Sequence, residues 1–281
     1  MIDQNLARPA QSAEMSGSGP LLVTSHRRSG THLLIDLLRN NFDDYFTGWL
    51  SLDRVLATAP GRPLRTAEIR GLGEASMILK SHARGDGREF FDTESLRFPA
   101  TELFRTFDTS PSVYVLRDPA DTLNSLYRYW TAQGLSGGVD FETFLTKPNP
   151  SFTGDSALSS ELNVVDYWTR HALEGVERCD RVIKFEDIVA NGGVKALSVV
   201  AELLGLEAVS DPRSVYVRAT RFEGHLPTRL RSFTVKTRAR RQGISLSSVQ
   251  HSAGSKRAGV SAEQRARIHA SLPDELKKLF R

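Results

Sequence analysis

Cysteine is nearly absent from this sequence, since Cys179 is the only one among 281 residues. A single thiol excludes a disulfide framework or a cysteine-based metal site within one chain, and it is typical of a reducing compartment. Long apolar runs are missing as well, and no stretch approaches the roughly eighteen residues of a membrane-spanning helix. Residues 1–18 are polar and lack the apolar core of a secretory signal. We therefore expect a flexible lead-in over residues 1–18, no membrane span and a cytoplasmic location.

A strong excess of charge of one sign is also lacking, because 37 basic residues face 33 acidic ones and leave a net charge of +4. Such a surface is usually just solvated, and it gives only slight support for an anionic ligand. The length, together with a hydrophobic fraction of 40%, suits one large core. We therefore predict a single domain over residues 19–281. The composition, rich in Ala and Arg, suggests a bacterial source.

Short apolar, β-branched runs alternate with segments of helical periodicity. This alternation predicts an α/β fold of three layers with a central, mainly parallel sheet. The predicted strands are residues 21–24, 77–79, 113–116 and 181–185, and the predicted helices are residues 31–42, part of 98–107, 119–131, 161–178 and 193–204. Residues 206–260, rich in Arg, Ser, Thr and Gly, predict loops with short helices. Helical spacing returns after Ser261, an expected N-cap with Gln264 three residues on.

The segment SHRRSGTH, residues 25–32, joins the first predicted strand to the first predicted helix. A helix that starts directly after a strand directs backbone N–H groups and a positive dipole end at one point. Ser29 and Gly30 are small enough to let an oxyanion approach, Thr31 adds a hydroxyl and Arg28 a full charge. The loop is therefore a candidate anion site. An ordinary strand–turn–helix with solvated arginines is the alternative.

A magnesium-dependent nucleotide loop fits this segment less well. The Walker A pattern needs two glycines with four residues between them, followed by Lys and then Ser or Thr. Ser25 stands where the first glycine belongs, and Thr31 stands where the lysine belongs. Magnesium nucleotide chemistry is therefore disfavoured.

A second strand-to-helix junction follows the strand at 113–116. Arg117 stands at the strand's carboxyl end, and Asp118 with Pro119 opens a helix as N-cap and first residue. Ser125 lies eight positions after the arginine, so both could bind one phosphate at the strand edge. Alternatively, Arg117 forms an ion pair with Asp118 or Asp121.

The third element is Lys80-x-His82, which we place directly after the strand at 77–79. A histidine there, beside a lysine and opposite two anion loops, is a candidate general base with a charge stabiliser. The alternative is a histidine that merely packs at the end of a strand.

Together these elements resemble the cytosolic-type sulfotransferases, which use 3′-phosphoadenosine 5′-phosphosulfate and have a P-loop-like α/β fold. The family's Pro-[Lys/Arg]-Ser-Gly-Thr loop is similar to residues 27–31, its Arg-Asp-Pro motif with a later serine to Arg117 and Ser125, and its Lys-x-His to Lys80 and His82. Its Tyr-Glu-Asp and Thr-x-Phe motifs are similar to residues 185–187 and 220–222. The resemblance implies His82, Lys80 and Arg28 as catalytic residues. As donor-binding residues it implies Arg27, Arg28, Ser29, Gly30, Thr31, His32, Arg117, Ser125, Phe185, Thr220, Phe222, Arg241, Gln242 and Gly243.

The sequence departs from the family pattern at four points. Leu33 replaces a tryptophan that contacts adenine, Phe185 replaces the tyrosine of Tyr-Glu-Asp, and Arg27 replaces the loop proline. The carboxyl-terminal Arg-Lys-Gly that binds the 3′-phosphate has its better counterpart in residues 241–243, and Lys256 with Arg257 is the alternative.

The resemblance implies transfer of a sulfuryl group to a hydroxyl, or less readily an amine, of a small-molecule, glycan or lipid acceptor. It implies adenosine 3′,5′-bisphosphate as the product, no metal and no nucleic-acid partner, and it leaves a homodimer open. Two other functions remain alternatives: a P-loop kinase or nucleotidase, and a non-catalytic protein that binds anions or nucleic acid through the arginines of residues 213–257.

Overall fold

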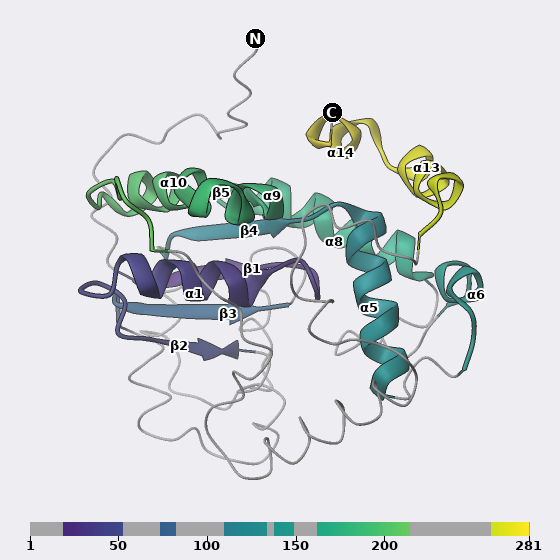
Figure 1. Cartoon of the computed structure of the whole chain (residues 1–281), viewed down its shortest axis with the longest axis horizontal. Coiled ribbons are helices and arrows are strands. Elements are labelled where there is room, and N and C mark those ends of the chain that lie inside the picture. Colours follow the sequence, from purple (N-terminus) through teal and green to yellow (C-terminus); the bar gives the residue numbers. More distant parts are fainter. Residues whose placement is uncertain are drawn as a thin grey trace. The chain divides into compact units, whose positions relative to one another are not determined.

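Five parallel strands form a sheet in the order β2-β3-β1-β4-β5 (Figure 1). The strands are β1 (Leu21–Thr24), β2 (Gly48–Ser51), β3 (Met77–Ser81), β4 (Ser112–Leu116) and β5 (Arg181–Lys184). The parallel sheet predicted from the sequence is thereby confirmed. Neighbouring strands are in register, so that Val23 lies opposite Lys80 and Thr24 opposite Ser81.

The structure is a computed structural model, and it describes residues 19–52, 74–82, 110–133, 138–148, 162–213 and 260–280. The chain divides into two compact units. The first is formed by Met1–Leu116 and His171–Val215, and the second by Arg117–Arg170 and Tyr216–Arg281. The single domain over residues 19–281 stays a prediction.

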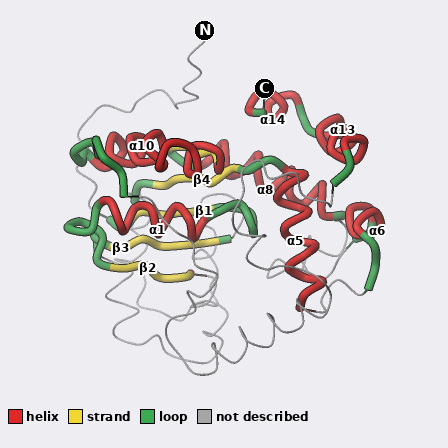
Figure 2. The backbone as a smooth tube through the Cα atoms, viewed as in Figure 1, coloured by secondary structure: helices red, strands yellow, loops and turns green. Residues whose placement is uncertain are grey.

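In the first unit, helices cover both faces of the sheet. On one face α1 (Thr31–Asn41) and α10 (Val194–Leu204) lie side by side (Figure 2). They pack on apolar side chains of the strands, such as Val23 and Val113. On the other face, the last part of α8 (Val164–Arg178) packs against Tyr114, so closely that a Cβ at Gly175 would lie 2.2 Å from the tyrosine ring. The three predicted layers are confirmed.

The strands that face helices on both sides are mostly apolar, because neither face meets water. β1 and β4 are buried throughout. β2 was not predicted, since its sequence Gly-Trp-Leu-Ser is short and lies at the edge of the sheet, where burial is partial.

Several predicted boundaries differ by one to three residues, and two of these differences bear on the site. β3 extends to Ser81, so Lys80 lies within the strand and not after it. β5 ends at Lys184, because Phe185 begins the short helix α9 (Phe185–Val189), which continues into the 3-10 turn η3 (Ala190–Gly193). Glu186 and Asp187 stand in the first turn of α9, where negative charge favours a helix. The helix predicted within residues 98–107 lies outside the described residues.

The second unit contains α5 (Pro119–Gln133), α6 (Phe141–Thr146), the start of α8, α13 (Ala262–Ser271) and α14 (Asp274–Leu279). Aromatic rings join α5 to α6, with the Tyr127 ring 5.3 Å from the rings of both Phe141 and Phe144. The predicted capping box of Ser261 and Gln264 is confirmed at the start of α13. Across the described parts of both units, no helix combines the length and the apolar character that a membrane crossing requires.

Candidate active site

The segment between β1 and α1 is closed by a hydrogen bond between the hydroxyls of Ser25 and Thr31. At the same point the Ser25 N–H donates to the Ser81 carbonyl at 3.3 Å, which ties the loop to the end of β3. The predicted anion loop therefore has its first and last residues joined and one edge anchored to the sheet.

Within the loop the backbone turns twice into the left-handed region, at Arg28 with φ 74° and at Gly30 with φ 103°. Ser29 lies between them and donates its N–H to the His26 carbonyl at 3.2 Å. Such alternating conformations are typical of backbone concavities that bind anions. α1 then begins at Thr31, with no acidic residue in its first turn. The loop and the positive end of the helix dipole therefore favour negative charge at the same place.

Phe185 reaches this loop from α9. Its side chain is buried and its ring packs on Gly30. Phe185, which the resemblance implies as a donor-binding residue, therefore contacts the loop; its role in binding stays a prediction.

His82 lies across from the loop, directly after β3. Its Nδ1 lies 2.9 Å from the Ser25 carbonyl oxygen and 3.4 Å from the Ser25 hydroxyl. Because a carbonyl oxygen can only accept, Nδ1 carries the hydrogen, and in the neutral ring the lone pair is on Nε2. The sequence predicted His82 as a base, and this geometry identifies Nε2 as the basic atom.

The surroundings of His82 favour its neutral form. Burial lowers the pKa of its imidazole well below the ordinary value, and the positive charge of Lys80 lowers this pKa further. The bond to the Ser25 carbonyl raises it by less, and Arg27 and His32 add smaller lowering effects. The Lys80 side chain is itself buried. The ring is therefore neutral at neutral pH and able to take a proton.

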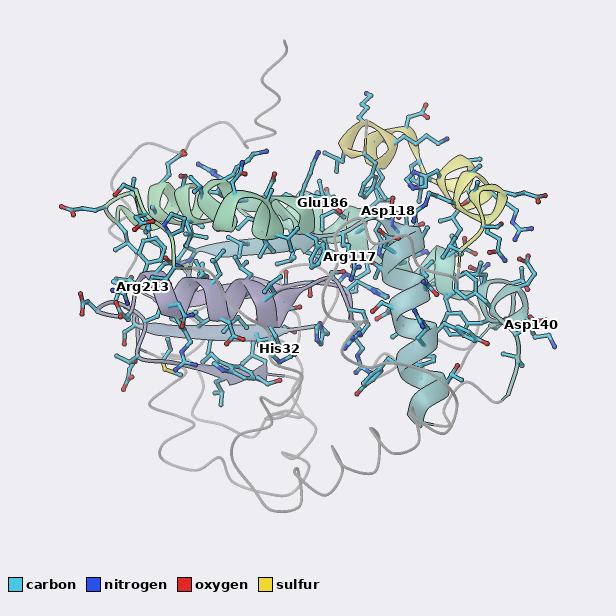
Figure 3. All side chains as sticks on the ribbon, viewed as in Figure 1. His32, Arg117, Asp118, Asp140, Glu186 and Arg213 are labelled. Carbon is cyan, nitrogen blue, oxygen red and sulfur yellow. The ribbon has the colours of Figure 1, made fainter. Side chains whose placement is uncertain are left out.

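The basic residues around His82 come from separate elements of the first unit. Lys80 belongs to β3, Arg27 to the loop, and His32 to the first turn of α1, where its ring contacts Trp49 edge-on at 5.3 Å. His32 lies toward the carboxyl ends of the strands, whereas Arg213 lies at the opposite end of this unit (Figure 3). Basic side chains therefore lie at the carboxyl ends of the strands, which is where α/β folds bind ligands.

Three buried residues near His82 were not predicted from the sequence: His26, Tyr114 and His171. His171 bonds both the His82 carbonyl and the Tyr114 hydroxyl, and the His26 ring contacts it edge-on at 5.4 Å. Burial lowers the pKa of His26 well below the ordinary value, and His171 lowers this pKa further. A histidine on the apolar face of the helix predicted over residues 161–178 was the available signal.

The predicted phosphate anchors, Arg117 and Ser125, belong to the second unit. Arg117 directly follows β4 in the chain and Ser125 lies on α5, and both side chains are buried. Asp118 caps α5 as predicted, since the Asp121 N–H donates to its carboxylate at 3.1 Å.

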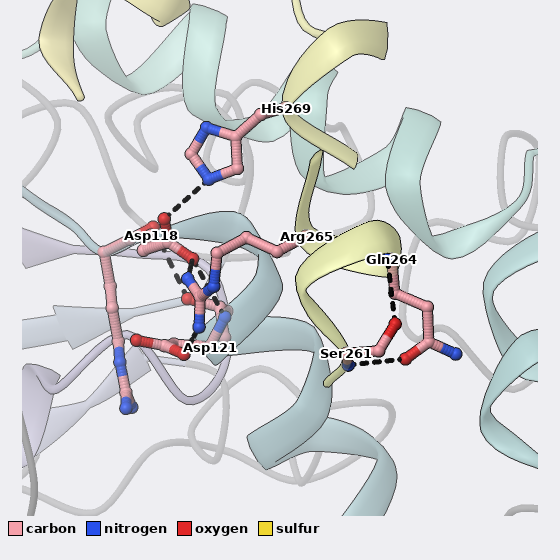
Figure 4. Close-up of polar contacts among 8 residues, drawn as sticks. Asp118, Asp121, Ser261, Gln264, Arg265 and His269 are labelled. Carbon is pink, nitrogen blue, oxygen red and sulfur yellow. Dashed lines mark hydrogen bonds and ion pairs between the residues drawn. The ribbon is translucent and has the colours of Figure 1, made fainter. Parts of the chain in front are cut away.

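The acidic residues at the start of α5 are held by α13 (Figure 4). Arg265 bridges Asp118 at 2.7 Å and Asp121 at 2.5 Å, and the His269 Nε2 lies 2.7 Å from the second Asp118 oxygen. Among the described residues, these are the ion pairs of the two carboxylates. The alternative that paired them with Arg117 was wrong.

The remaining predicted residues lie outside the described residues: Thr220, Phe222, Arg241, Gln242 and Gly243, with the alternative Lys256 and Arg257. Within the parts of the chain that are described, no group of three His, Cys, Asp or Glu side chains is placed to hold a metal ion.

No protein-family model matches the sequence, and the comparison with curated proteins found no match either. Among solved structures, the chain is similar to mouse sulfotransferase SULT7A1 complexed with PAP, with a TM-score of 0.41 and 18% identity over 68% of this chain. The match spans 59% of the mouse protein, less than two thirds of its length. It is also similar to a sulfotransferase from Alicyclobacillus acidocaldarius, with a TM-score of 0.40, 16% identity, and coverage of 83% of this chain and 99% of that one.

Proposed function

We propose that the protein is a sulfotransferase, which moves the sulfuryl group of 3′-phosphoadenosine 5′-phosphosulfate to a hydroxyl, or less readily an amine, of an acceptor. One observation carries the proposal: the His82 imidazole, bonded through Nδ1 to the Ser25 carbonyl, stands beside the loop that the Ser25 and Thr31 hydroxyls close. Transfer of an anionic group to a protonated nucleophile requires a base that takes the nucleophile's proton and a site that binds the anionic group. Both lie at the carboxyl ends of the strands.

The loop and its cations act on the negative charge. Arg28, the α1 N-terminus and the buried Lys80 would stabilise charge on the sulfuryl oxygens and on the departing phosphate. A buried cation acts more strongly than an exposed one, because less water screens it. Fixed groups of this kind need no reorganisation when the reaction occurs.

His82 acts on the acceptor. The acceptor oxygen forms a bond to sulfur while the bond from sulfur to the phosphate oxygen breaks, and the acceptor's proton passes to Nε2 of His82. The leaving group is adenosine 3′,5′-bisphosphate. Arg117, Ser125 and Phe185 would hold the nucleotide, together with Thr220, Phe222 and the residues 241–243, so that binding positions the sulfur for attack.

The kinase alternative fits the loop less well. In a magnesium-dependent P-loop, a lysine would replace Thr31 and a glycine would replace Ser25. Here the hydroxyls of these two residues bond each other. The loop is closed by side chains that the kinase pattern lacks.

Calorimetry with adenosine 3′,5′-bisphosphate in the presence of a chelator tests donor binding, and we expect binding without metal. Radiolabelled donor offered to phenols, sugars and lipid headgroups then tests transfer and identifies the acceptor class. Binding only with magnesium, or no transfer to any acceptor in spite of tight nucleotide binding, would contradict the proposal.

A further inference from the structure

His171 is completely buried on α8 and connects two strands to each other. Its Nε2 lies 3.1 Å from the backbone carbonyl oxygen of His82, directly after β3. Its Nδ1 lies 2.8 Å from the hydroxyl of Tyr114, which is equally buried on β4. All three residues belong to the first unit.

The two bonds fix the hydrogens of this group. The His82 carbonyl can only accept, so the His171 Nε2 carries a hydrogen and donates it. In the neutral ring Nδ1 then offers a lone pair, and the Tyr114 hydroxyl donates to it. Both ring nitrogens of a side chain without solvent access are thereby satisfied, as buried polar groups generally are.

The bond to His82 falls where the strand pairing stops. β3 ends at Ser81, whose carbonyl accepts the N–H of Ser25. One residue further on, the carbonyl of His82 is bonded by the His171 side chain of α8 and not by a neighbouring strand. His82 is thus held twice, by its ring to Ser25 and by its carbonyl to His171.

We propose that His171, supported by Tyr114, is a positioning residue that holds the His82 imidazole against the Ser25 carbonyl; its importance for catalysis rests on the proposed function. The contact runs through the peptide carbonyl, so no proton passes between the two rings. His171 acts only by fixing the backbone from which the His82 side chain projects. A displacement of about 1 Å at a reacting group can cost about 10²-fold in rate.

Three variants separate positioning from simple packing. His171→Leu removes both bonds while keeping an apolar side chain in the space. His171→Gln restores a donor near the position of Nε2. Tyr114→Phe keeps the ring and removes only the hydroxyl that supports His171.

The first measurement needs no substrate. The His82 ring signal is identified by its loss in His82→Gln and followed by NMR through a pH titration. Burial, Lys80, Arg27 and His32 hold the pKa of His82 down in the native arrangement. In His171→Leu the ring leaves its buried position beside Ser25. Loss of burial, the largest cause of the low pKa, outweighs loss of the Ser25 bond, which raises the pKa, so the pKa should rise toward about 6.5. In His171→Gln it should stay low.

The second measurement is turnover per folded molecule with the best acceptor from the radiolabel screen. We expect kcat to fall about 10- to 100-fold in His171→Leu with affinity for adenosine 3′,5′-bisphosphate unchanged, and to be largely restored in His171→Gln. Tyr114→Phe should fall between wild type and His171→Leu, and it tests the proposal even where His171→Leu does not fold.

The outcomes are distinct. An unmoved His82 titration in His171→Leu, or in Tyr114→Phe where that variant alone folds, overturns the proposal, and so does an equal loss in His171→Leu and His171→Gln. If the wild type transfers no sulfuryl group at all, the proposed function fails. A shifted His82 titration would still establish the positioning contact.

Discussion

The ring of Phe185 lies against Gly30 so closely that a Cβ on this glycine would fall 2.4 Å from the phenylalanine Cδ2. The glycine also has a φ of 103°, which side-chain-bearing residues rarely adopt. Two independent constraints, one of backbone conformation and one of packing, therefore require glycine at this point of the anion loop.

Gly30→Ala should accordingly lower the free energy of unfolding by on the order of 2–4 kcal/mol, from backbone strain and from the clash with the ring. In a Phe185→Leu background the clash should be relieved and a smaller cost remain. A double-mutant cycle by urea unfolding measures the difference, and we expect a coupling of about 1 kcal/mol or more. Strict additivity would mean that the ring does not constrain the glycine.

His82→Asn should reduce turnover by about 10²–10⁴-fold and leave donor affinity nearly intact, because a base contributes only once attack begins. Burial and Lys80 lower the pKa of His82, so the wild-type rate should hold as the pH falls through about 6.5 and decline only at lower pH. That acidic decline should vanish in the variant. An asparagine variant with wild-type turnover would end the assignment of His82 as base.

Buried His26 should make stability depend on pH. Its pKa is lowered in the folded state, so below about pH 6.5 the unfolded chain takes up a proton that the folded chain does not. The free energy of unfolding should therefore fall as the pH drops from about 6.5 toward the folded pKa, by up to about 1.4 kcal/mol per pH unit. Above about pH 6.5 it should not change with pH.

Urea unfolding at about pH 7.5 and about pH 5.5 checks this, in a range where ordinary carboxylates are ionised in both states. His82 contributes in the same direction, since its pKa is also lowered. His26→Asn should reduce the pH dependence without abolishing it. A dependence that His26→Asn leaves unaltered would contradict the prediction.

Arg117→Ala should weaken binding of adenosine 3′,5′-bisphosphate by on the order of 1.5–3 kcal/mol, the value of a charge-assisted hydrogen bond, and Ser125→Ala should weaken it less. Arg213→Ala serves as the matched control, because this exposed arginine pairs with Asp43. Calorimetry on the three variants separates loss of a contact from loss of positive charge in general. Equal affinities for Arg117→Ala and Arg213→Ala would remove Arg117 from the site.

Two arginines of α13 offer a comparison of ion pairs. Arg265 bridges two carboxylates at the start of α5, whereas Arg267 pairs with Glu142, and both partners of that pair are largely exposed. Arg265→Ala should cost about 1 kcal/mol of stability and Arg267→Ala at most about 0.5 kcal/mol, since exposed pairs are screened by water. Thermal unfolding at low and high salt measures both, and equal costs at low salt would show that the bridge adds nothing.

The parts of the fold that could be predicted were those with a local signal. β1 and β4 each contain a run of at least three consecutive apolar residues, and the capping box at Ser261 marks the start of α13. β2 has no such signal, because four residues that begin with glycine and end with serine resemble a loop. It forms because β3 offers it an edge to pair with, which only the assembled sheet supplies.

The candidate site divides in the same way. Residue types and spacing identified the loop and His82, since each is a short motif. The atoms that give His82 its tautomer and position, the Ser25 carbonyl and the His171 ring, are 57 and 89 residues away in the chain. Their meeting depends on the strand order, and nothing in one sequence states which strands are neighbours.

The residue-by-residue pairing of β1 with β3 also bears on how this protein can change over time. Val23 stands opposite Lys80 and Thr24 opposite Ser81, so the length of chain from Met77 to His82 sets where the imidazole lies. Losing one residue from this stretch would turn the following side chains to the other face and carry His82 away from Ser25. Single substitutions here can be accommodated by repacking, but a deletion cannot. Related proteins that keep the reaction should therefore show amino-acid substitutions between Met77 and His82, but no insertions or deletions there.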